Sequence, residues 1–446
     1  MFYSLKIILV FVLVAGPAVS AFAGVISSES VSAEIERAEP VFRWRAKSIP
    51  IAISASLLRQ SSNIKTGSDV LGAVRRSLRT WEDAANIEFK ESFSDRQNVS
   101  PQGIAGDGVS LITVAPSAEN VLLFAKNPED TAATTRVFFD GRGRITEADI
   151  VLNPYQQFST DGTFGTFDLQ STLTHEIGHF LGLAHSPMRG SAMYDNFAKN
   201  GVFGLQGFSL RTLSELDRAA IRAKYGAPES DSECCGSISA KILTPEGRVA
   251  SNVDVWIEGD KTGKVSAESV TNSEGVLQVS GLSSGTYTLY SKRKTRARNS
   301  VPGQEIGSVT VEAGETATLT KRLNSGSDDI DVKYIGFNGQ ISGSVVPVNA
   351  GKTYTIYIGG KNLSAKTSSV RFSSPNLSVV PGSLVTHDFG DDFSVISFEM
   401  SADSNTPVGE YSVFVDSASG GRSAVVGGIA VRTFLNPYSN FVLDGN

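Results

Sequence analysis

The sequence predicts a multidomain protein in which an α+β domain, a mixed twisted sheet with one long helix at its centre, precedes two all-β sandwich domains. The chain has 446 residues, too many for one ordinary domain and enough for about three. Apolar residues recur at helical intervals of three and four only before residue 226, and later apolar runs alternate with period two. The 43 glycines suit turn-rich β structure.

The N-terminus has the pattern of a secretory signal peptide. Lys6 precedes a short apolar run over 7–15, and Ala21-Phe22-Ala23 is a small-residue cleavage pattern. The run is broken by glycine and proline and is shorter than the roughly 20 residues that span a bilayer, which disfavours a membrane anchor. We therefore predict a signal peptide over 1–23, cleaved near Ala23, a secreted extracellular protein and no transmembrane segment.

A short N-terminal segment, 24–41, leads into the α+β domain, which we place at 42–227. Residues 48–53 alternate as a strand, and Val70, Val74, Leu78 and Trp81 form the apolar stripe of a helix. Further short apolar runs predict strands at 109–114, 136–139 and 150–152. Together they predict a sheet of the five-stranded type.

Two later helices carry end signals. Asp168 is a suitable N-cap for a helix whose apolar stripe repeats every four residues from Leu169. Ser214 and Asp217 have the spacing of a capping box, and Gly226 ends that last helix.

The two β domains are predicted at 237–323 and 333–433, joined by polar linkers at 228–236 and 324–332 and followed by a tail at 434–446. Cys234 and Cys235, the chain's only cysteines, are adjacent in the first linker. A small, partly buried pair is the favoured interpretation, and a vicinal disulfide or an intermolecular bridge stays open.

Charge gives little indication of a macromolecular partner. The net charge of -6 gives no reason to expect nucleic-acid binding. One basic run could bind an anionic polysaccharide or membrane surface, although a solvated loop is the favoured interpretation; it comprises Lys292, Arg293, Lys294, Arg296 and Arg298. Asp328, Asp329 and Asp331 are interpreted as a charged linker rather than a calcium site. We expect a monomer.

The sequence at 175–185 is HEIGHFLGLAH. A helix stacks His175 and His179 on one face because they are four residues apart. Gly182 can turn the chain sharply, so that His185 returns as a third ligand. Three histidines leave one position of a tetrahedral zinc open, the mark of a catalytic site. Three of the chain's four histidines lie in this motif, and the fourth, His387, is interpreted as a surface residue.

This spacing predicts hydrolytic chemistry. Zinc lowers the pKa of the water in the open position, and Glu176 next to His175 is placed to take its proton and return it to the leaving amine. The sequence thus predicts one catalytic zinc on His175, His179 and His185, with Glu176 as general base.

The extended motif, Ser186 after the third histidine, and Ser191-Ala192-Met193-Tyr194 resemble the metzincin metalloproteases, specifically the matrixins. The resemblance covers about 42–226 and implies a zinc metalloendopeptidase that acts on protein or peptide substrates. It also implies that Met193 forms an apolar floor under the metal. Structural calcium is common in the family, but no ligands can be assigned here.

The chain also departs from the matrixin pattern. No cysteine precedes the domain to cap the zinc, and Asp195 stands where many relatives have proline, so neither a cysteine-based latency switch nor substrate specificity carries over. Tyr194 directly follows Met193 and is interpreted as structural.

The second domain resembles carboxypeptidase regulatory-like sandwiches in Gly236-Ser237-Ile238 and 271–275, and the third resembles immunoglobulin-like sandwiches in 359–363 and 407–411. Such domains would target the enzyme to a substrate or surface. The alternative is a binding or adhesion protein with an inactive metal domain, which the intact Glu176 disfavours.

Overall fold

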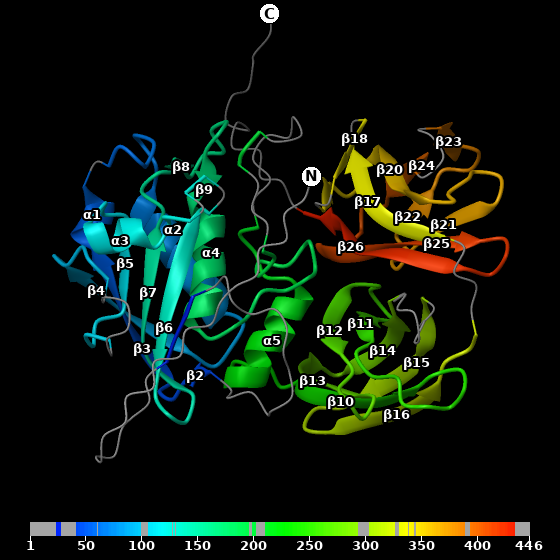
Figure 1. Ribbon diagram of the computed structural model, residues 1–446, viewed down its shortest axis with the longest axis horizontal. Coiled ribbons are helices and arrows are strands. Elements are labelled where there is room, and N and C mark those ends of the chain that lie inside the picture. The colour runs from blue at the N-terminus through cyan, green and yellow to red at the C-terminus, as the bar shows by residue number, and fades with distance from the viewer. Residues whose placement is uncertain are drawn as a thin grey trace, which may run out of the picture.

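The computed structural model describes residues 24–27, 42–59, 61–99, 106–126, 128–129, 131–195, 199–201, 210–292, 303–325, 330–337, 339–342, 345–388 and 393–432. These residues form three domains, each around its own hydrophobic core (Figure 1). Several sequence predictions lie outside the described residues: the signal peptide, the tail, Arg293, Lys294, Arg296, Arg298, Asp328 and Asp329.

The first domain is built on one mixed sheet, with strand order β1-β6-β7-β5-β3-β4 and β2 beside β7. Its strands are β1 (Gly24–Ser27), β2 (Arg43–Trp44), β3 (Ser48–Ser54), β4 (Glu88–Ser94), β5 (Leu111–Thr113), β6 (Ala133–Phe139) and β7 (Arg144–Leu152). β3, β4, β5 and β7 are parallel, and β6 runs antiparallel to β7. The sheet has more strands than the five expected, because the short strand β1 pairs with β6 and the short strand β2 pairs with β7.

Helices of the first domain pack on this sheet and on one another. They are α1 (Ala55–Leu58), α2 (Val70–Glu82), α3 (Ala118–Leu122), α4 (Leu169–Phe180) and α5 (Glu215–Tyr225), with a two-stranded ribbon of β8 (Phe158–Ser159) and β9 (Phe167–Asp168) before α4. The predicted apolar stripe of α2 is real, since Val74, Leu78 and Trp81 are buried. α4 contacts both α2 and the strands β6 and β7.

The second domain consists of two sheets with strand orders β13-β10-β16 and β12-β11-β14-β15. The strands are β10 (Cys234–Leu243), β11 (Asp254–Gly259), β12 (Val265–Val270), β13 (Val276–Ser283), β14 (Gly285–Ser291), β15 (Gln304–Val311) and β16 (Thr316–Arg322). Both sheets contribute to one core, for example through Ile238 and Ile257, as in a sandwich.

The third domain also has two sheets around one core, of six and four strands. Its strands are β17 (Asp331–Phe337), β18 (Gln340–Ser342), β19 (Val346–Val348), β20 (Thr353–Lys361), β21 (Ser368–Phe372), β22 (Leu377–Val379), β23 (Val385–Asp388), β24 (Ser394–Ala402), β25 (Gly409–Ser417) and β26 (Arg422–Val431). β10 and β17 begin inside the segments expected to be linkers, because Cys234 and Asp331 already pair with neighbouring strands.

The cysteine pair sits at the start of β10. Cys234 and Cys235 form a disulfide with each other, and both side chains are partly buried. The favoured expectation of an unlinked pair is therefore replaced by the vicinal disulfide that the sequence left open.

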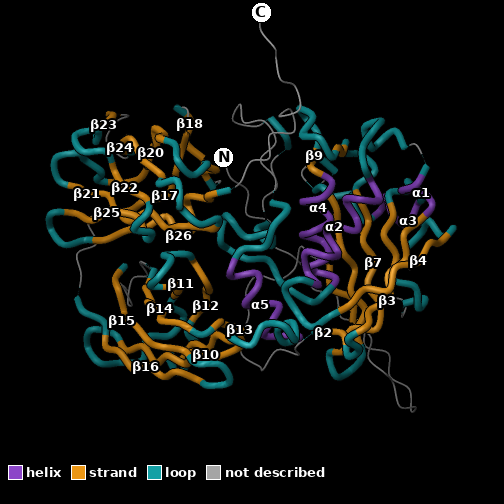
Figure 2. The backbone as a smooth tube through the Cα atoms, turned by 180° about the vertical axis from the view of Figure 1, so that it is seen from behind, coloured by secondary structure: helices purple, strands orange, loops and turns teal. Residues whose placement is uncertain are grey.

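The three domains contact one another directly. α5 of the first domain lies against β12 and β13 of the second, and β12 also contacts β25 of the third (Figures 1 and 2). Lys264 is central to this junction: its Nζ lies 3.5 Å from Glu215 Oε1 in α5, and its backbone forms an isolated bridge with Tyr411 in β25. Within the described residues, no helix has both the length and the apolar composition to cross a membrane.

Candidate metal centre

The helix α4 carries the first two histidines and is firmly anchored. Its N-cap, Asp168, accepts a hydrogen bond from the Ser171 amide at 2.8 Å and forms an ion pair with Arg211. The indoles of Trp81 and Trp44 each donate to a helix carbonyl, of Thr174 and Phe180 respectively, at 2.8 Å. All twelve residues of α4 are buried, so the helix has no solvent-facing side.

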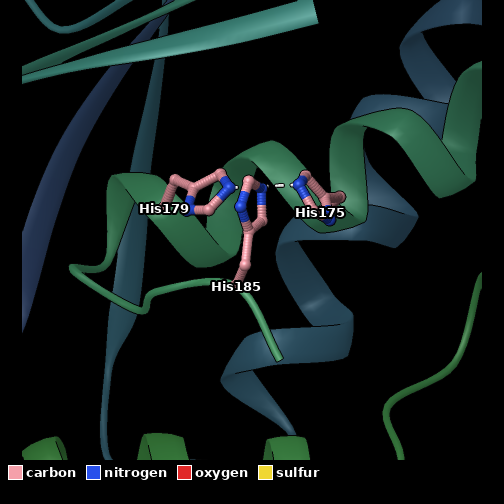
Figure 3. Close-up of side chains that lie close together, drawn as sticks. All are labelled: His175, His179 and His185. Carbon is pink, nitrogen blue, oxygen red and sulfur yellow. Dashed lines mark hydrogen bonds between the residues drawn. The ribbon is translucent and has the colours of Figure 1, made fainter. Parts of the chain in front are cut away.

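His175, His179 and His185 converge at one point (Figure 3). α4 supplies the first two, and the loop after it supplies the third. Gly182 makes the return possible, since its φ of 83° is in the left-handed region and an added Cβ would overlap the Phe42 carbonyl. One ligand nitrogen from each ring lies within 4.8 Å of the others. Among the described residues this is the one cluster of three such side chains that could hold an ion.

Backbone carbonyls fix the orientation of the two helix imidazoles. His175 Nδ1 faces the Ala192 carbonyl and His179 Nδ1 faces the Leu183 carbonyl, both at 2.8 Å. A carbonyl only accepts, so each Nδ1 carries the proton and each Nε2 has a lone pair. Burial, the largest effect on all three, lowers the pKa of each histidine, that of His179 to about 3, which keeps the rings neutral.

This arrangement fits a zinc ion. His175 Nε2 and His179 Nε2 lie 3.0 Å apart, and two nitrogens on a tetrahedral zinc would be separated by about 3.4 Å for typical Zn–N bonds. Two lone pairs that face each other at this separation repel, and a cation between them turns the repulsion into ligation. The outer contacts to carbonyls are of the kind that orient metal-bound histidines.

Glu176 is held beside this cluster by strand β6 of the sheet. Its Oε2 accepts a hydrogen bond of 2.5 Å from Thr135 Oγ1 in β6, and the same hydroxyl lies 3.1 Å from the Glu176 carbonyl. Burial raises the pKa of the Glu176 carboxyl to about 7, against the opposing effect of the Thr135 hydrogen bond. Thr135 could not be identified from the sequence, because it lies 41 residues before Glu176 on another element.

Met193 packs against α4, the helix that carries the first two histidines. It is 2% exposed, and its sulfur occupies the space where a side chain at Gly178 would begin. Gly178 lies between His175 and His179 in α4, so a larger residue there would push the helix off Met193. The glycine of the motif thus permits close contact of helix and methionine.

Asp217 connects the Met193 turn to α5. Its carboxylate accepts from Ser191 Oγ at 2.5 Å and from the Ala192 amide at 2.8 Å. It also accepts from the amide and hydroxyl of Ser214, which completes the predicted capping box. The sequence indicated only the capping role of Asp217; its contacts to the turn join segments 25 residues apart.

Other residues singled out from the sequence lie away from the ligands or at their margin. Asp195 is exposed, and its charge opposes part of the burial effect that lowers the pKa of His185; Tyr194 is half-buried against Arg189. Lys292 is exposed, and Asp331 begins β17. The expectation that His387 is a surface residue is wrong in part: it is partly buried and its Nε2 lies 2.7 Å from Ser397 Oγ.

Comparison with known proteins agrees with this site. Residues 43–226 match the family model of the matrixins, peptidase family M10. Matrix metalloproteinase-2 of Drosophila melanogaster is 28% identical over 161 residues, which cover 35% of this chain and 18% of that protein. The hatching enzyme of Paracentrotus lividus is 27% identical over 190 residues, covering 40% of this chain and 26% of that protein.

The chain thus spans less than a third of the length of these two relatives. Among solved structures, the major pilin subunit BcpA of Bacillus cereus overlaps 45% of this chain and 70% of its own length with a TM-score of 0.19 and 12% identity, a likeness from which nothing follows. Residues 43–226 are a matrixin-like domain, and the three histidines fit the zinc that this family implies.

Proposed function

We propose that this protein is a secreted zinc-dependent endopeptidase that hydrolyses peptide bonds of extracellular proteins. The observation that supports it most strongly is the convergence of three neutral, carbonyl-oriented histidines beside a buried glutamate. The matrixin match over 43–226 supports the same conclusion.

In this proposal His175, His179 and His185 bind the metal through their inward nitrogens. When bound, a zinc ion polarises the substrate carbonyl and lowers the pKa of a water molecule toward neutrality. Met193 packs closely against α4 at Gly178, and the burial of α4 holds His175 and His179 in fixed positions, while His185 is only partly buried.

Glu176 acts as the general base. Its carboxylate takes a proton from the attacking water while the new C–O bond forms, and gives that proton to the amine nitrogen as the C–N bond breaks. Thr135 keeps one carboxylate oxygen in place and leaves the other available for the proton. The products are a carboxylate and an amine, so no further reactant is needed.

The second and third domains would bring the catalytic domain to a substrate or a surface. Lys292 and the basic residues that follow it in the sequence are one candidate for an anionic partner. Removal of these charges should then weaken retention on an acidic polysaccharide without changing cleavage of a short peptide.

The catalytic proposal is tested by comparing Glu176→Ala with His179→Ala in the full chain. Zinc content and cleavage of a proteome-derived peptide library are measured for both and for the wild type. We expect Glu176→Ala to keep zinc and lose about 100-fold or more in rate, and His179→Ala to lose both. Unchanged cleavage by Glu176→Ala would refute the mechanism, and a wild type that holds zinc but cleaves nothing would favour a binding or adhesion protein.

A further inference from the structure

The chain between the third histidine and Met193 lies against the third domain. Met188, in the middle of this segment, is 1% exposed and is seated on Gly427 of β26. A Cβ added at Gly427 would lie only 2.8 Å from Met188 Cγ, so the glycine leaves the space that the methionine side chain fills. β26 therefore contacts the segment 186–194, which we call the ligand-to-floor segment, at Met188.

A buried ion pair of the third domain fixes the next part of this segment. Arg432 and Glu410 form a salt bridge in which both side chains are at most 9% exposed, and Arg432 Nη2 also donates to the Gly190 carbonyl at 3.2 Å. Gly190 in turn leaves room for Glu410, since an added Cβ would overlap Glu410 Cγ. The ion pair thus recognises one backbone position of the first domain.

A third contact between the two domains involves Arg189, which also lies near Tyr194. Arg189 Nη2 donates to the Lys333 carbonyl of β17 at 3.0 Å. The Arg189 guanidinium also interacts electrostatically with the side chain of Tyr194, the residue after Met193, and lowers the pKa of that phenol against the larger effect of burial. The third domain therefore contacts the ligand-to-floor segment at three consecutive residues, Met188, Arg189 and Gly190.

The pleat of β25 explains why the third domain presents Glu410 here. Tyr411, Val413 and Val415 point into the domain's own core. The residues between them point to the opposite face of the strand, where Glu410 meets the first domain and Phe414 meets Trp256 of the second. A buried ion pair contributes little net stability but strongly favours one geometry, which suits a contact whose role is position.

We infer that the third domain is a positioning element of the metal centre: through Arg432, Glu410 and Gly427 it holds the ligand-to-floor segment so that His185 and Met193 keep their places. The inference rests on the proposed zinc site for its effect on catalysis. The contact itself is independent of the metal. Arg432 and Glu410 are positioning residues, since neither touches the histidine cluster.

The sharpest test is Gly190→Ala in the full chain, which places a methyl group against Glu410 and alters no ligand. Gly141→Ala is the matched control, because a Cβ there meets nothing within 4 Å. Amide hydrogen exchange over 186–194 is measured on the metal-free protein. The rate of zinc loss to a chelator, and kcat and KM for cleavage of a short peptide, are measured on the zinc-loaded protein. In Gly190→Ala we expect amide exchange and zinc loss to be about tenfold faster than in the wild type, and kcat to fall by a larger factor than KM rises. We expect Gly141→Ala to behave like the wild type in all of these measurements.

A second pair of variants separates a steric effect from general unfolding. In a Glu410→Ala background the clash partner is gone, so adding Gly190→Ala should change exchange and zinc loss less than twofold. Equal exchange over 186–194 in Gly190→Ala and wild type would overturn the inference, and so would an undiminished effect in the Glu410→Ala background. A wild type that binds no zinc would instead refute the proposed function, and the exchange comparison would still decide the positioning role.

Discussion

At the scale of single residues, the placement of Glu176 depends on one hydroxyl. Thr135 Oγ1 donates to Glu176 Oε2 at 2.5 Å, and both side chains are buried. A hydrogen bond to a buried carboxylate contributes about 1.5–3 kcal/mol. The geometry of the proposed base should therefore be sensitive to a substitution that removes only this hydroxyl.

We predict that Thr135→Val lowers kcat for peptide cleavage by about tenfold or more, while zinc content stays at the wild-type level. Valine keeps the shape of threonine but cannot donate a hydrogen bond, so Glu176 loses its fixed orientation. Thr135→Ser, which retains the hydroxyl, is the control and should keep most of the activity. Equal rates for the valine variant and the wild type would show that the hydroxyl does not position the base.

The same residues mark the limit of what the sequence could predict about the site. The ligands, Glu176 and Met193 lie within one short stretch of chain, where helical spacing and a family motif are informative. Thr135, the second role of Asp217 and the Arg432–Glu410 pair come from distant elements. Their positions depend on how the elements pack, and no local periodicity encodes that packing.

At the scale of elements, α4 begins at a charged cap rather than a neutral one. Asp168 caps the helix through Ser171 and is also paired with Arg211, whose Nη2 donates to the Thr160 carbonyl at 2.8 Å. The cap therefore fixes both the start of the helix and the chain that returns toward α5. Because the helix carries His175 and His179, its alignment and the metal site are linked.

We predict that Asp168→Ala lowers the stability of the first domain by about 2–4 kcal/mol, because the cap and the partner of Arg211 are both lost. Asp168→Asn keeps the cap and should cost about half as much. Calorimetric unfolding of the full chain with each variant measures the difference. Similar losses for alanine and asparagine would assign the whole effect to the charge and none to the cap.

The elements that could be predicted from the sequence are those whose signals lie close together in the chain. The ends of α4 and α5 were predictable because capping side chains act within one turn, and Asp168, Ser214 and Gly226 take those positions. β4 was missed because its two apolar residues, Phe89 and Phe93, are four positions apart with only polar residues between them, so the run shows no clear period of two. Glu410 lies in a strand whose two faces are both buried, and a charged residue there gave no indication of its partner.

At the scale of the whole molecule, the third domain is joined to both others through the outer face of β25. Phe414 packs against both Tyr290 and Trp256 of the second domain, with ring centroids 5.2 and 6.1 Å away, and the Arg371 guanidinium lies 3.8 Å from the centre of its ring. Glu258 of β11 is enclosed next to this cluster and accepts from the Trp256 indole at 2.9 Å. A titratable group thus lies inside the contact between the two sandwiches.

Burial raises the pKa of Glu258 from 4.5 to about 7, and its hydrogen bonds from Ser412 and Trp256 offset only part of that effect. The charged groups that act on it are Arg371, which lowers the pKa, and Asp260, which raises it. Tyr290, stacked on Trp256, is the remaining titratable neighbour. Because the folded state holds the proton more tightly than the unfolded chain, stability falls as the pH rises from 4.5 through about 7.

We therefore predict that Glu258→Gln stabilises the joined sandwiches at pH 8, by at most about 3 kcal/mol for a shift of that size, and has little effect at pH 4.5. Glutamine is neutral at every pH and keeps the size of the side chain, so it removes the cost of ionisation alone. Thermal unfolding of the full chain across this pH range measures the effect, with the exposed Glu274→Gln as the control. A stabilisation that is equal at both pH values would mean that Glu258 stays ionised in the folded protein, and that the contact between the sandwiches tolerates a buried charge.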